Sequence, residues 1–238
     1  MKRSDLDHAF SHGGKLRAPP MSGIARELWD LQFYAPPRPD PASLPSGEGR
    51  AVLVIPALLT DDWYTKGLRT YLSRCGFLAF ASKLGPNWGP TPKIRDKLRK
   101  RVADIRSRVG MTINLIGISM GGLLARDLAF DYPNDIAHVV TIGSPITLPA
   151  ASNLEGLIRL CAPFYSDDID LARLGRPLPV PWTSIYSKRD GIIDWRSCLA
   201  EETGGVCIEV DAPHLAMARN PDALRSLITR LADTTHSS

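Results

Sequence analysis

Short apolar runs alternate with amphipathic segments along most of this chain. The runs have the length of β-strands and are bounded by turn-forming residues, at 51–55, 77–80, 112–118, 137–142, 182–186 and 206–210. Apolar residues recur at helical spacing in the segments between them, at about 62–74, 93–108, from 119 onward and 221–231. Strands that alternate with helices through short connections predict an α/β fold, with a mostly parallel sheet covered by helices on both faces.

The most basic segment of the chain has a clear helical pattern. Residues 93–108 contain eight bases and two acids, and apolar residues recur beneath the charges at Ile94, Leu98, Val102, Ile105 and Val109. Gly110 is a natural helix stop. We interpret this segment as an amphipathic helix with a solvated basic face. No interleaved aromatic residues or binding motif support a nucleic-acid partner, so none is predicted.

The first 49 residues differ in composition from the rest of the chain. Residues 1–20 are polar and basic, and Ser22 can cap a helix in which Ile24, Leu28 and Leu31 form one stripe. A proline-rich connector then leads to residue 50. We therefore predict an N-terminal extension with one helix over 1–49 and an α/β domain over 50–238, whose short helical cap spans about 147–181.

Composition and charge exclude several classes of protein. With 238 residues, 44% hydrophobic and 23% charged, and a net charge of +4, the chain is typical of a soluble single-domain protein. It contains no run of 18 apolar residues and no apolar core in its first residues, so we expect a cytoplasmic location and no stable membrane insertion. The oligomeric state is not predicted. Its cysteines form no C-x-x-C pair and are expected to be free thiols, although Cys198 and Cys207 flank one loop and could be bridged in an exported protein.

The best candidate for chemistry is Ser119. It stands at the centre of Gly117-Ile118-Ser119-Met120-Gly121, where an apolar strand ends and a helix begins. A serine on such a sharp turn has an exposed hydroxyl, and the two glycines relieve the crowding that the turn imposes. The five-residue pattern alone is weak evidence, because it arises often by chance, so the strand–turn–helix context carries the prediction.

A nucleophilic serine needs a histidine as base and a carboxylate that orients the histidine. His214 follows the last strand, in the loop where a parallel sheet places its active-site residues. Asp190 follows the preceding strand, and we prefer it to Asp194 and Asp211 as the acid. The remaining histidines lie near the ends of the chain or at the entry of a strand and are less suitable: His8, His12, His138 and His236.

The tetrahedral intermediate also needs two backbone donors for its oxyanion. The N–H of Met120, directly after the nucleophile, is one candidate. The second is expected from the loop after the first core strand, residues 55–60. The order Ser119, Asp190, His214 differs from that of the chymotrypsin and subtilisin triads.

These segments resemble one known family. Its motifs are matched by Val52-Leu53-Val54-Ile55-Pro56, Asp62-Trp63-Tyr64, the Ser119 turn, Ile142-Gly143-Ser144-Pro145, the segment 187–193 and the loop of His214. From about residue 50 to its end, the chain is similar to bacterial α/β-hydrolases of the lipase and esterase type. The resemblance implies a three-layer fold, the triad Ser119, Asp190 and His214, and oxyanion donors at Leu58 and Met120. Many relatives have glycine where this chain has Ala57, which leaves Ala57 as an alternative to Leu58.

The expected activity is hydrolysis of carboxylic esters through an acyl-serine intermediate, without metal or organic cofactor. Apolar residues of the cap, together with Trp63 and Trp88 on the same rim, suit a small-molecule or lipid-like ester. Acyl transfer or thioester cleavage by the same triad is an alternative. A binding protein that kept the fold without catalysis is another.

Overall fold

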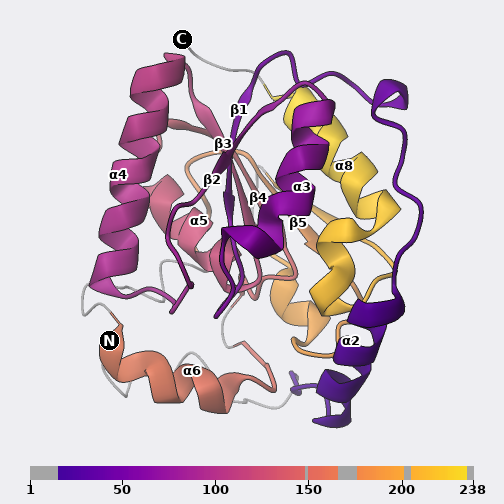
Figure 1. Ribbon diagram of the computed structural model, residues 1–238. Coiled ribbons are helices and arrows are strands. Elements are labelled where there is room, and N and C mark those ends of the chain that lie inside the picture. The colour runs from indigo at the N-terminus through magenta and orange to yellow at the C-terminus, as the bar shows by residue number, and fades with distance from the viewer. Residues whose placement is uncertain (1–15, 148–149, 166–175, 201–204, 235–238) are drawn as a thin grey trace.

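A six-stranded parallel sheet forms the centre of the computed structural model, which describes residues 16–147, 150–165, 176–200 and 205–234 (Figure 1). The sheet has the strand order β2-β1-β3-β4-β5-β6, and every neighbouring pair is parallel. The strands are β1 (Ala51–Ile55), β2 (Leu78–Ala81), β3 (Ile113–Ile118), β4 (Ile136–Ile142), β5 (Trp182–Tyr186) and β6 (Gly205–Glu209). The predicted α/β class is therefore confirmed.

Helices cover both faces of the sheet. In Figure 1, α4 (Pro92–Val109) and α5 (Met120–Asp131) lie on one side, and α3 (Asp62–Arg74) and α8 (Pro221–Ala232) on the other. Successive residues of a strand point to opposite faces. Leu53 thus packs in one core cluster with residues of α4, whereas Val54 packs in the other with residues of α3 and α8. Strands buried on both faces explain the continuous apolar runs of the sequence.

The basic helix α4 has the predicted ends but not the predicted surface. The hydroxyl of Thr91 caps its first turn, and Gly110 ends it in the left-handed conformation at φ 68°. The expected solvated basic face is wrong in part, because Arg95 and Arg101 are buried. Arg95 bonds Asp127 of α5 at 2.9 Å. Acidic residues on the neighbouring helix therefore neutralise part of this face.

The N-terminal helix α2 (Ser22–Phe33) exists as predicted, with two differences. Its N-cap residue is Met21, which makes no side-chain bond, so the predicted Ser22 cap is wrong. The buried residues are Gly23 and Glu27, whereas Leu28 of the predicted apolar stripe is 58% exposed. The helix is held against η4 (His214–Arg219) by polar contacts as well as by packing: Arg219 donates to the carbonyl of Leu31 at 3.0 Å.

The cap region contains one short helix, α6 (Glu155–Cys161), followed by the 3-10 turn η2 (Ala162–Phe164). In Figure 1, α6 lies below the sheet, at the edge where the strands end. Leu157 and Ile158 are half-buried, and Leu160 and Phe164 are exposed. Two parts of the predicted cap, 148–149 and 166–175, fall outside the described residues.

Further sequence predictions concern cysteines, membrane segments and metal sites. All four cysteines are free, including Cys198 and Cys207. No helix among the described residues combines the length and the apolar character that crossing a membrane requires. The same part of the chain holds no group of three or more His, Cys, Asp and Glu side chains placed to bind a metal ion. His8, His12 and His236 lie outside the described residues.

Candidate active site

Ser119 occupies a strained turn between β3 and α5. Its φ of 52° and ψ of −120° lie in a backbone region that side chains other than glycine rarely adopt. A Cβ on Gly117 would lie 2.3 Å from the carbonyl oxygen of Gly121, and one on Gly121 would lie 2.4 Å from that of Ile55. Both positions therefore exclude any larger residue, which gives the glycines of the motif their physical reason.

Asp190 and His214 meet at the ends of β5 and β6. The Oδ2 atom of Asp190 lies 2.6 Å from Nδ1 of His214, and both side chains are almost completely buried. The other oxygen of Asp190, Oδ1, accepts the N–H groups of Ile192 and Ile193, each at 2.8 Å. Asp190 is thus fixed by its own loop and leaves one oxygen for the imidazole.

The competing residues are engaged elsewhere. Asp194 caps η3 (Trp195–Cys198) by accepting the N–H of Arg196. Asp211 is exposed and pairs with Arg189 at 3.3 Å. His138 is buried in β4 and lies 2.9 Å from the hydroxyl of Thr183, so it has a structural role.

The backbone of Ser119 and the imidazole of His214 both lie at the end of β4. The N–H of Ser119 donates to the carbonyl of Ile142 at 2.8 Å. Gly143, which follows Ile142 at the end of β4, lies so close to the imidazole that a Cβ on it would be 3.1 Å from Nδ1 of His214. Ser119 and His214 therefore converge on the end of β4, where Asp190 also reaches the ring.

Two opposing effects act on the pKa of His214. Burial disfavours the charged imidazolium and lowers the pKa, whereas the Asp190 carboxylate and, more weakly, the Glu27 carboxylate favour it. The carboxylates prevail, and the pKa of His214 is raised above its ordinary value of 6.5. A base of this kind has a stronger drive to accept a proton from an alcohol than an ordinary histidine.

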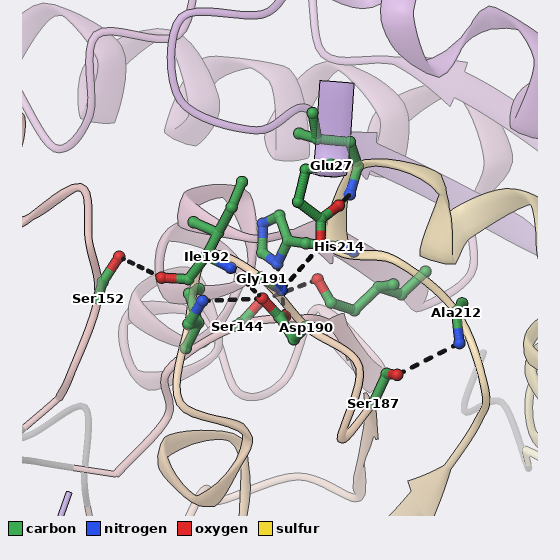
Figure 2. A network of polar contacts seen from close by, with 12 residues as sticks. Glu27, Ser144, Ser152, Ser187, Asp190, Gly191, Ile192, Ala212 and His214 are labelled. Carbon is green, nitrogen blue, oxygen red and sulfur yellow. Dashed lines mark hydrogen bonds and ion pairs between the residues drawn. The ribbon is translucent and has the colours of Figure 1, made fainter. Parts of the chain in front are cut away.

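Serine hydroxyls hold the acid loop in place (Figure 2). The Oγ atom of Ser187 accepts the N–H of Ala212 at 3.2 Å, which joins the acid loop to the base loop. Ser152 donates to the carbonyl of Ile192 at 3.0 Å and ties the acid loop to the segment before α6. The Asp190 carboxylate is therefore positioned by contacts from several parts of the chain.

The turn after β1 lies beside the start of α5. The ideal Cβ of Gly121 would lie 2.6 Å from the carbonyl oxygen of Pro56, so the turn passes directly over the first turn of that helix. The N–H of Leu59 donates to the carbonyl of Asn87 and that of Thr60 to the carbonyl of Ala57. Within the part of the chain that the structure describes, neither the N–H of Ala57 nor that of Leu58 has an acceptor, as an oxyanion donor requires, so both alternatives remain open.

Asn87 supports this turn and was not singled out by the sequence. It is fully buried, its side-chain amide donates to the carbonyl of Pro56 at 2.7 Å, and its Oδ1 accepts the N–H of Gly89 at 2.9 Å. An asparagine inside a Gly/Pro-rich loop is a common turn residue, so the sequence could place Asn87 in a turn. It could not predict that the side chain bonds Pro56 of another loop.

An apolar cavity of about 690 Å³ lies beside the loop of Asn87, and none of its lining residues belongs to the predicted triad or to the turn after β1. It is formed by the loop after β2, the start of α4 and the cap, including Leu84, Trp88, Ile94, Leu160 and Phe164. Trp88, predicted to bind substrate, is among its walls and is 54% exposed. Trp63, the other predicted residue, is 81% exposed on α3 and does not line the cavity.

Comparison with known proteins gives similarity in structure only. No protein-family model matches the chain, and no curated protein matches it in sequence. A monoacylglycerol lipase of Paleococcus ferrophilus superposes with a TM-score of 0.56 at 17% identity, over 79% of this chain and 96% of the lipase. A lipase-esterase related protein of Clostridium acetobutylicum gives 0.57 at 13% identity, over 79% and 97% of the two chains. The thioesterase domain of the curacin biosynthetic pathway gives 0.53 at 15% identity, over 78% and 92%.

These neighbours share the architecture of this chain, although their identity to it is low. Each is covered almost completely, so the similarity includes the sheet and its flanking helices rather than a single motif. The parallel six-stranded sheet and the strained serine after β3 agree with that architecture. The chain has the α/β-hydrolase fold.

Proposed function

We propose that this protein is a serine hydrolase that cleaves carboxylic esters through an acyl-serine intermediate. Hydrolytic enzymes, including lipases and esterases, are among its structural neighbours. The observation that supports the proposal best is the buried contact of 2.6 Å between Asp190 and His214, beside the strained turn of Ser119. A neutral imidazole with a carboxylate behind it is the base that a serine hydroxyl needs.

In the proposed mechanism, Asp190 holds the proton of His214 on Nδ1, which leaves Nε2 free as the base. As Oγ of Ser119 attacks the ester carbonyl carbon, Nε2 accepts the hydroxyl proton and the carbonyl becomes an oxyanion. The intermediate collapses, and the imidazolium gives its proton to the departing alcohol. Water gives a proton to the same nitrogen as it attacks the acyl-serine carbonyl. The second tetrahedral intermediate then releases the carboxylic acid as the imidazolium returns that proton to Oγ of Ser119.

The oxyanion would be stabilised by the N–H groups of Met120 and Leu58. Met120 is the first residue of α5, where the N–H groups have no partner within the helix and the helix dipole favours negative charge. Leu58 offers an N–H that is otherwise unpaired within the described residues, and Ala57, whose N–H is also unpaired there, stays the alternative donor. One such donor typically contributes roughly 3–4 kcal/mol to transition-state stabilisation.

The apolar cavity beside the Asn87 loop is our candidate site for the hydrocarbon part of the substrate, although no residue of the proposed triad lines it. Its walls suit the hydrocarbon part of a small-molecule or lipid-like ester, with Trp88 as a contact. Trp63 lies away from this cavity, so its predicted role in substrate binding stays a prediction.

Stopped-flow hydrolysis of p-nitrophenyl acetate, butyrate and octanoate tests the proposed function. We expect a burst of p-nitrophenol equal to the enzyme concentration, absent in Ser119→Ala and in His214→Ala. Retention of the burst in a correctly folded Ser119→Ala protein would refute the assignment.

A thioesterase activity with the same residues is a second candidate, because a thioesterase domain is among the structural neighbours. Parallel assays with an acyl thioester and the matching oxygen ester separate the two activities. A higher kcat/KM for the thioester would replace the ester proposal without changing the triad. Addition of an alcohol or thiol acceptor, with product analysis, reveals acyl transfer.

A further inference from the structure

Glu27 is a fully buried carboxylate that the proposed mechanism does not use. It belongs to α2, far from the triad in sequence, yet it lies beside His214 and Gly191 in Figure 2. An ionised carboxylate in the interior is costly unless hydrogen bonds replace its water. Among the described residues, no Lys or Arg forms an ion pair with it, so its partners must be of another kind.

Its partners are three backbone N–H groups from two loops. Oε1 accepts from Gly191 at 2.7 Å and from His214 at 2.9 Å, and Oε2 accepts from Leu215 at 3.0 Å. Gly191 directly follows the proposed acid, Asp190, and His214 is the proposed base. One side chain therefore fixes the backbone of both loops at the same time.

Helix α2 packs closely against the loop that contains Gly191. A Cβ on Gly23 would lie 2.5 Å from the carbonyl oxygen of Gly191, and a Cβ on Gly191 would lie 2.9 Å from Oε1 of Glu27. Two glycines thus allow the helix to seat its carboxylate on the loop. The lack of room for a Cβ on either glycine indicates that Glu27 is a built part of the site rather than a side chain that happens to be covered.

We propose, on the basis of the function above, that Glu27 is a positioning residue that sets the acid and base loops and stabilises positive charge on His214 during turnover. The three bonds hold Asp190 and His214 at the separation that their 2.6 Å contact needs. The negative charge also acts on the imidazole, because Glu27 contributes to the raised pKa of His214. Positioning to within about 1 Å can decide a factor of roughly 100 in rate.

Besides Glu27, three charged or titratable side chains of the described residues lie near His214, and only Asp190 among them adds negative charge. Asp190 faces the ring from the loop after β5, and Tyr64 of α3 donates its hydroxyl to the carbonyl of Leu215 at 2.9 Å. Burial raises the pKa of Tyr64 to about 12, so it stays neutral near pH 7. Arg219, at the end of η4, donates to the carbonyl of Leu31. Asp190 and Glu27 are thus the two anions that favour the imidazolium.

Glu27→Gln is the most informative variant. Its Oε1 can keep the bonds to Gly191 and His214, but its amide nitrogen would place a donor against the N–H of Leu215. The substitution therefore removes the charge and one of three bonds while conserving volume. We expect kcat/KM to fall about 10- to 100-fold and the acid limb of its pH profile to move to lower pH, because the imidazolium loses a stabilising anion.

Glu27→Asp and Asp30→Asn complete the test. Aspartate keeps the charge but is one methylene too short to make all three bonds, so kcat should fall while the acid limb stays near that of the wild type. Asp30, one turn further along α2, forms an ion pair with the half-exposed Arg189 at 3.7 Å and with no other cation of the described residues, and Asp30→Asn should leave both rate and profile unchanged. If Glu27→Gln does not fold, a normal kcat in Glu27→Asp overturns the proposal by itself.

The inference and the proposed function can fail separately. A wild-type protein that hydrolyses none of the esters or thioesters would refute the function. NMR titration of the His214 imidazole without substrate still tests the charge effect, with a lower pKa expected in Glu27→Gln. An unchanged pKa together with activity that falls only as the folded fraction falls would make Glu27 a purely structural residue and overturn the inference.

Discussion

Asp190→Asn is the substitution whose outcome the structure specifies most fully. The oxygen Oδ1 of Asp190 accepts two N–H groups, from Ile192 and Ile193. An asparagine that turned its amide nitrogen toward them would lose two hydrogen bonds, each worth about 1 kcal/mol net. The new side chain should therefore keep its oxygen there and present its NH₂ group to Nδ1 of His214.

This orientation reverses the tautomer of the imidazole. Nδ1 must then accept, so its proton moves to Nε2, which can no longer take the proton of Ser119. Disruption of the same kind lowers kcat about 10⁴-fold in a serine protease, which is about 5 kcal/mol in activation free energy. We expect a loss of that order here, measured as kcat for p-nitrophenyl butyrate at pH 7.5.

Asp194→Asn is the matched control for this experiment. Asp194 is also buried and only four residues away, but it caps η3 and does not contact His214. Asparagine is a good N-cap residue, so kcat should stay within a few-fold of the wild type. The reasoning is refuted if Asp190→Asn keeps more than a tenth of the wild-type kcat, or if Asp194→Asn loses as much as Asp190→Asn.

Three further predictions follow from the geometry of the site and the sheet. Because the pKa of His214 is raised and its neutral form is the base, kcat/KM should rise with pH through a midpoint above 6.5; a midpoint below 6.5 in the pH–rate profile would contradict the carboxylate effect. Gly121→Ala would drive a Cβ into the carbonyl of Ile55, so we expect urea unfolding to show about 1–3 kcal/mol of destabilisation and the p-nitrophenol burst to disappear. Unchanged stability and an unchanged burst would refute the close approach of Gly121 to Ile55. Burial lowers the pKa of His138 to about 4, so this histidine takes up a proton in the unfolded protein before it does in the folded protein as pH falls below 6.5. The free energy of unfolding of the wild type should therefore fall by about 2 kcal/mol between pH 7.5 and 5, a loss that His138→Gln should not show. Equal losses in the two proteins would refute this.

The sheet could be predicted because its strands carry their own signal. A run such as Ala51–Ile55 is apolar throughout, and all five residues are buried. Helix α4 could be predicted equally well, because Thr91 and Gly110 mark its ends and four of its predicted apolar residues are buried. The buried arginines of α4 were missed because partners such as Asp127 of α5 for Arg95, and the carbonyl of Ala81 for Arg101, become neighbours only in the folded chain.

The environment of the triad was less accessible to sequence reasoning. The apolar spacing of α2 favoured a buried stripe that includes Leu28, but Leu28 is exposed and Glu27 is buried instead. A glutamate is normally an exposed helix residue. The burial of Glu27 depends on the N–H groups of Gly191, His214 and Leu215. No pattern within residues 22–33 predicts these contacts. The roles of Ser119, Asp190 and His214, and the cytoplasmic location, stay predictions.

Site mapping of a covalent adduct tests the central claim most directly. The folded wild-type protein is treated with a fluorophosphonate, digested, and analysed by mass spectrometry. We predict one adduct per chain, located on Ser119, formed much more slowly in His214→Ala and in Asp190→Asn. A folded wild-type protein that forms no adduct, or forms it on another residue, would contradict the claim that Ser119 is an activated nucleophile.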